Sequence, residues 1–152
     1  TFLKLSPPLR TEKDRLALVE SVEDGTIDVI VSDHKPQDEE SKRLTFAQAA
    51  TGATGVETLL PLALELYHNN SVKLKKLIAA ITTNPAKILG INKGSFDKGN
   101  DADLCVIDIN KPWIVNKERL KSKSKNTPIE NRKLQGQVLK TFVKGELVYE
   151  NI

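Results

Sequence analysis

The feature that most constrains the fold is a strand, helix, strand order in the first third of the chain. An apolar, β-branched run over residues 27–31 predicts a short strand buried on both faces, as in a parallel sheet. Residues 11–25 before it predict a helix that Thr11 caps and Gly25 ends. Residues 1–5 predict the end of an earlier strand. This order is typical of the βα repeats of barrels and doubly wound sheets.

Three further helices are predicted before residue 93. Their ranges are 58–68, 71–81 and 84–90. Ser71 is the expected cap of the second helix, and Asn84, followed by proline, is the expected cap of the third. The polar stretch 35–51 that precedes them is long for a connection, and connections of this length commonly carry function.

The last third of the chain has a different texture. It predicts short strands over residues 104–109, 113–115, 138–143 and 146–150. The pair Lys144 and Gly145 between the last two strands predicts a tight hairpin, because glycine accepts a positive φ. We therefore expect two units, an α/β unit over residues 1–93 and a small antiparallel β unit over residues 94–152.

Composition excludes several classes of protein. With 152 residues, 39% of them hydrophobic and 28% charged, the chain predicts a globular protein with a core, and no stretch is apolar enough to cross a membrane. The basic run 117–125 lacks aromatic residues that could stack on bases, which favours a solvated loop over a nucleic-acid site. One cysteine excludes a disulfide framework and fits the cytoplasm. Because there is no methionine, we expect a portion of a longer chain.

The sharpest candidate for chemistry is Asp33, which follows the strand predicted over residues 27–31. In α/β barrels, catalytic side chains project at this carboxyl edge. An aspartate at a strand end also commonly caps the next turn, so position alone leaves both roles open. The neighbouring His34 equally suits a packing or hydrogen-bonding role. One aspartate and one histidine do not make a metal site, which needs three or four ligands.

Five motifs in order resemble those of the dihydroorotase family. They are residues 5–10 (LSPPLR), 24–36 (DGTIDVIVSDHKP), 52–58 (GATGVET), 83–90 (TNPAKILG) and 98–106 (KGNDADLCV). Each motif alone is weak, whereas five in the family's order across nearly the whole chain are a specific signal. The resemblance implies the C-terminal part of a TIM (β/α)8 barrel, about its last two βα units, followed by a small antiparallel β unit.

The resemblance also implies a reaction, the reversible hydrolysis of the cyclic amide of dihydroorotate to carbamoyl aspartate. One or two metal ions, usually zinc, activate the water in this family. By the same resemblance, Asp33 is a metal ligand and the general base. Ser6, Gln37 and the backbone around Thr51 and Gly52 are the implied substrate contacts.

Two of these positions depart from the family pattern, since Ser6 replaces an asparagine and Gln37 a histidine. Each change can remove a charge-assisted bond, which keeps open an alternative function as a non-catalytic scaffold subunit of aspartate transcarbamoylase. The family's remaining metal ligands precede the matched region. We therefore expect one isolated copy to lack a catalytic metal site, and to self-associate through apolar faces left uncovered.

Overall fold

The computed structural model describes residues 1–151 as an α/β chain with one three-stranded antiparallel sheet. The helices are α1 (Glu12–Asp24), α2 (Glu39–Lys42), α3 (Leu59–His68), α4 (Leu74–Ile81) and α5 (Thr83–Leu89). The strands are β1 (Leu104–Ile114), β2 (Lys133–Val143) and β3 (Glu146–Glu150), with a short 3-10 helix, η1 (Lys117–Arg119), between β1 and β2. In the described part of the chain, no helix is long and apolar enough to span a membrane.

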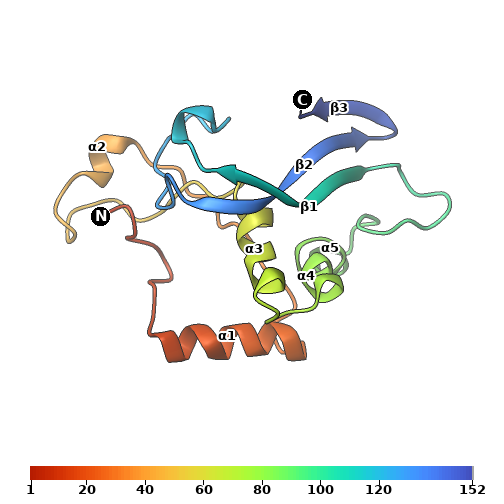
Figure 1. The fold of residues 1–152 in the computed structure, drawn as a ribbon, viewed down its shortest axis with the longest axis horizontal. Helices are drawn as coiled ribbons and strands as arrows, with labels where there is room; N and C mark the ends of the chain where they lie inside the picture. The colour runs from red at the N-terminus through yellow and green to blue at the C-terminus, as the bar shows by residue number, and fades with distance from the viewer. Residues whose placement is uncertain (152) are drawn as a thin grey trace.

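The sheet lies on one side of α3, and α1 lies at the far end of that helix (Figure 1). The strand order is β1-β2-β3, and both neighbouring pairs are antiparallel. The helix α3 packs closely against β2 at Gly136, where an added Cβ would stand 2.3 Å from the Leu64 side chain. A glycine is therefore needed where the helix meets the sheet.

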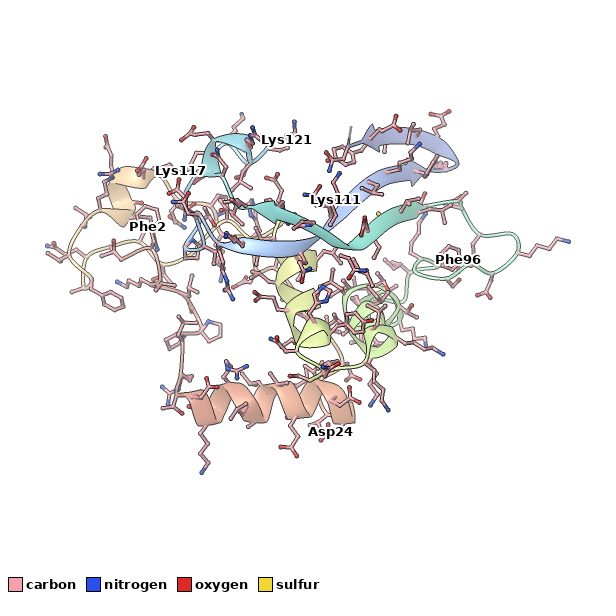
Figure 2. The ribbon with its side chains drawn as sticks, in the orientation of Figure 1. Phe2, Asp24, Phe96, Lys111, Lys117 and Lys121 are labelled. Carbon is pink, nitrogen blue, oxygen red and sulfur yellow. The ribbon has the colours of Figure 1, made fainter. Side chains whose placement is uncertain are left out.

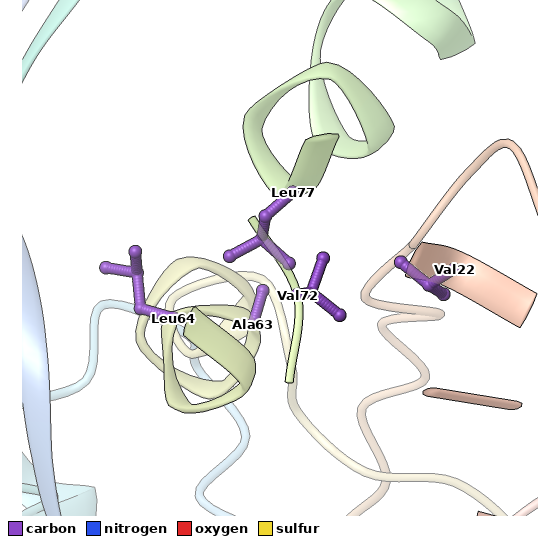
Figure 3. Packing of buried hydrophobic residues seen from close by; sticks show 5 residues of the cluster. All are labelled: Val22, Ala63, Leu64, Val72 and Leu77. Atoms are coloured by element: carbon purple, nitrogen blue, oxygen red, sulfur yellow. The ribbon is translucent and has the colours of Figure 1, made fainter. Parts of the chain in front are cut away.

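The main hydrophobic core joins α1, α3 and α4. Val22, Ala63, Leu64, Val72 and Leu77 form its buried cluster (Figure 3). The side chains of Leu64 and Leu77 are 0% exposed, so they are the centre of this core. Burial of apolar area here is the main force that holds α3 and α4 together.

The strands predicted over residues 1–5 and 27–31 do not form. Ile27 and Ile30 pack against the core instead, and the Ile30 N–H donates to the Ala80 carbonyl at 3.0 Å. Val31 is 67% exposed, so the segment is not buried on both faces. A parallel strand needs neighbours to pair with, and none of the described residues supplies one for this segment.

Helix starts and strand lengths also differ from the predictions. Lys73, not Ser71, precedes α4, and Asn84 lies inside α5, where its side chain donates to the Asp28 carbonyl at 2.8 Å. The two strands predicted over 104–109 and 113–115 are one strand, β1, with an irregular register between Asp108 and Pro112. The hairpin is confirmed, because Lys144 and Gly145 both have positive φ, at 51° and 84°.

Candidate functional site

A cavity of about 420 Å³ gathers three of the predicted site residues, Ser6, Asp33 and Gly52. Its apolar wall comes from α3 and from the segment that leads to Asp33, with Leu62, Leu66 and Ile30 among the lining residues. Small-molecule sites commonly combine such an apolar wall with a few converging polar groups. The cavity is therefore the candidate site, and its size suits a small ligand.

Asp33 stands at this cavity on an unusual stretch of backbone. Its φ is 40°, a left-handed value that non-glycine residues rarely adopt but that aspartate tolerates. One carboxylate oxygen lies 3.2 Å from the Lys35 ammonium, and both side chains are about half exposed, at 51% and 50%. The carboxylate is thus open to solvent and to a ligand, with a cation beside it that offsets its charge. Residues in this conformation occur in turns and also cluster at functional sites.

His34 has a connecting role. Its Nδ1 atom accepts hydrogen bonds from the N–H groups of Gly55 at 3.1 Å and Val56 at 3.4 Å. A ring nitrogen that accepts from N–H groups is deprotonated, which places the proton of the neutral ring on Nε2. Of the roles left open by the sequence, the hydrogen-bonding one is therefore the role seen here.

The other two predicted contacts, Gln37 and Thr51, are joined by a hydrogen bond. The Gln37 side-chain amide donates to the Thr51 carbonyl at 3.2 Å, and the Gln37 N–H donates to the side chain of Asn126 at 3.1 Å. Neither residue lines the cavity, whereas Gly52, directly after Thr51, does. The structure therefore places Ser6, Asp33 and Gly52 at the cavity, whereas Gln37 and Thr51 are outside its lining.

Gly52 is required by packing. Its φ is 130°, and an added Cβ would stand 2.6 Å from the Lys35 carbonyl oxygen. The Gly52 N–H donates to the Lys4 carbonyl at 3.0 Å. Its own carbonyl accepts from the Lys42 ammonium at 2.9 Å and from the Asn126 side chain at 3.2 Å. Both backbone polar groups of Gly52 are thus hydrogen-bonded within the chain.

Lys42 and Asn126 are the residues that sequence reasoning missed. Both side chains are 0% exposed. Burial lowers the pKa of the Lys42 ammonium, and the nearby charge of Lys4 lowers it further. A lysine in a polar loop and an asparagine beside a basic run both indicate solvated residues, so no local signal in the sequence reveals them.

The described residues do not make up a complete metal site. No three histidine, cysteine, aspartate or glutamate side chains among residues 1–151 come together. Asp33 offers one carboxylate, the Nδ1 of His34 is already engaged, and the Nε2 of His68 lies 3.0 Å from the Ile109 carbonyl. Asp33 is the one aspartate, glutamate, histidine or cysteine among the described residues that line the cavity, and a zinc site needs three or four ligands.

Comparison with known proteins gives consistent matches. The model of the Amidohydrolase family matches residues 5–148. Dihydroorotase from Ehrlichia canis is 46% identical over 149 residues, which are 98% of this chain and 33% of that protein. Dihydroorotase from Aquifex aeolicus is 44% identical over 148 residues, 97% of this chain and 35% of that one.

Solved structures agree. L-hydantoinase (dihydropyrimidinase) from Arthrobacter aurescens has a TM-score of 0.91 at 32% identity, covering 98% of this chain and 34% of its own. Dihydropyrimidinase from Brevibacillus agri has a TM-score of 0.90 at 24% identity. At this identity, the match indicates a shared fold and nothing more. The chain spans about a third of the length of the proteins it matches.

Proposed function

Because the chain belongs to the amidohydrolase family, we propose that it is the C-terminal portion of a dihydroorotase. Residues 1–93 would complete an α/β barrel, and residues 94–152 would form the β unit that follows it. The reaction is the reversible hydrolysis of the cyclic amide of dihydroorotate to carbamoyl aspartate. The similarity to two dihydroorotases over almost the whole chain supports this choice within the family.

The observation that carries the proposal is the Asp33 carboxylate at the cavity. As general base, this carboxylate takes a proton from the attacking water and delivers it to the ring nitrogen that leaves. Such a proton transfer contributes about 10²- to 10⁴-fold in rate. Lys35, whose ammonium lies 3.2 Å away, pairs with the carboxylate and restrains its direction.

Zinc is the metal we propose for the complete protein. Asp33 is the donor that the described residues place at the cavity, and the other ligands would come from outside residues 1–151. We therefore propose that the missing ligands come from the rest of a longer protein or from a separate chain.

Ser6, Gln37, Thr51 and Gly52 are the proposed substrate contacts. The positions of Ser6 and Gly52 at the cavity support this, and the hydrogen bond between Gln37 and Thr51 connects the other two to the same wall. The neutral amide of Gln37 offers a substrate carboxylate a hydrogen bond without the charge that a protonated histidine carries.

That departure is also what favours the second candidate function, a catalytically silent scaffold subunit of aspartate transcarbamoylase. A scaffold keeps the fold but has no use for a charged substrate contact. The two candidates differ in one measurable property, which is turnover of dihydroorotate by the complete protein.

The test compares Asp33→Asn with Asp97→Asn in the complete protein loaded with zinc. We expect Asp33→Asn to lower kcat at least 100-fold, because the amide cannot accept the proton. Asp97 is exposed and distant in sequence from the cavity residues, so its variant should keep wild-type turnover. A wild-type protein that binds zinc but does not hydrolyse dihydroorotate would favour the scaffold.

A further inference from the structure

Two fully buried polar side chains meet on the carbonyl oxygen of Gly52. The Lys42 ammonium donates to it at 2.9 Å and the Asn126 side-chain amide at 3.2 Å. Both side chains are 0% exposed. Burial of an ammonium without a carboxylate is costly, so its position depends on the carbonyl groups that accept its hydrogen bonds.

Lys42 connects two segments of chain that border the cavity. It lies at the end of α2, in the long loop after Asp33, and α2 lies beside the N-terminal segment (Figure 1). Besides Gly52, its ammonium donates to the carbonyls of Lys4 at 3.1 Å and Ala50 at 2.9 Å. Lys4 is two residues before Ser6. The three bonds therefore set the distance between the Ser6 segment and the Gly52 segment.

Asn126 makes the corresponding connection from the C-terminal unit. Its Oδ1 atom accepts from the Gln37 N–H at 3.1 Å and from the Ser124 hydroxyl at 2.6 Å. Its backbone carbonyl accepts from the Thr54 N–H at 3.4 Å. One side chain thus holds both ends of the loop, at Gln37 and at Gly52.

We propose that Lys42 and Asn126 are positioning residues that hold the Gly52 peptide and Gln37 in the geometry that binds substrate. The inference rests on the proposed function and assigns the C-terminal unit a part in substrate affinity. Neither residue touches the reacting atoms. When either side chain is removed, buried carbonyl or N–H groups lose their partner, and the loop moves to satisfy them. A substrate contact that has moved no longer bonds the substrate, in the ground state or in the transition state, so KM rises while kcat changes little.

The test uses the complete protein with the variants Asn126→Ala and Lys42→Met. Two quantities are measured: the exchange rates of the Gln37 and Gly52 amide hydrogens, and the kcat and KM for dihydroorotate. The controls are Asn116→Ala and Lys75→Met, which remove the same groups from exposed positions. We expect at least tenfold faster exchange and a KM raised about 10- to 100-fold in the test variants only, with kcat much less affected.

Asn126→Asp is the second variant, for the case that Asn126→Ala does not fold. The aspartate keeps an oxygen for the Gln37 N–H but has no donor for the Gly52 carbonyl. We expect it to protect the Gln37 amide from exchange and still to raise KM. A protected Gln37 amide together with a raised KM is not expected if the residue only stabilises the fold. Partial unfolding would instead lower the apparent kcat at constant KM.

Failure of this inference is distinguishable from failure of the proposed function. Unchanged amide exchange in the test variants, or a lower kcat at wild-type KM, would overturn the positioning role in an active protein. A wild-type protein without activity towards dihydroorotate would overturn the proposed function, and the substrate-binding role of the pair with it.

Discussion

At Gly52 the structure leaves no room for a side chain. We expect Gly52→Ala to lower the free energy of unfolding by about 1–3 kcal/mol, because the new Cβ meets the Lys35 backbone and the left-handed φ becomes strained. Gly25→Ala is a matched control, since Gly25 has a φ of 91° but no atom within 4 Å of the added Cβ. Urea denaturation of both variants separates the cost of the contact with Lys35 from the cost of the left-handed φ. Equal losses would mean that the contact with Lys35 contributes nothing.

The residues of the candidate site differ in whether the sequence alone identifies them. Ser6, Asp33 and Gly52 lie in motifs that single them out, and all three line the cavity although the strand predicted before Asp33 does not form. Lys42 and Asn126 carry no such signal, because their burial depends on segments far away along the chain. The contact between Gln37 and Asn126 spans 89 positions. Only the folded chain brings those two residues together.

The helix α1 begins at a capping box, which is set by residues close together in the sequence. The Thr11 hydroxyl accepts from the Asp14 N–H, and the Asp14 carboxylate accepts from the Thr11 N–H at 3.0 Å. We expect Thr11→Ala to lower the free energy of unfolding by about 1 kcal/mol in urea denaturation at neutral pH. Lys13→Ala, at an exposed position of the same helix, should change it by less than about 0.5 kcal/mol.

The same capping box predicts a pH dependence. Hydrogen bonds from the Thr11 hydroxyl and N–H hold the pKa of Asp14 below its usual value of 3.8. Because the folded state binds the proton less tightly, this stabilisation is present above the unfolded pKa and is lost as the pH falls through the folded pKa. The difference between wild type and Thr11→Ala should therefore shrink below about pH 4. A difference that stays constant down to pH 2 would contradict this account.

Local elements were predictable and distant pairings were not. The capping of α1, the Gly90 end of α5 and the hairpin between β2 and β3 depend on residues within a few positions of one another. The strand predicted over 27–31 depends on partners that the described chain does not contain, so its apolar residues pack on the helices instead. Strand pairing is a non-local property, and the sequence of one strand does not specify its neighbours.

For the whole molecule, the distribution of exposed apolar side chains is the unusual property. Several lie at the end of α5 and in the loop that follows it, and we call these the α5 patch: Ile88, Leu89, Ile91 and Phe96. Leu89 is 70% exposed and Phe96, on the loop that leads to β1, is 91% exposed (Figure 2). Exposed apolar side chains concentrated in one part of a protein are candidates for an interface, because large apolar surfaces are rare on monomeric proteins.

The α5 patch and the unpaired edges of the sheet together predict that the isolated chain self-associates. Sedimentation velocity over a range of concentrations should detect species larger than one copy. Leu89→Lys should weaken association, because a charged side chain must then be buried at the contact. Glu20→Gln makes the same change in net charge at an exposed position of α1, so it separates the loss of apolar surface from the change in charge. A compact monomer at every concentration would mean that the chain covers this surface by itself, and the argument from uncovered faces would then fail.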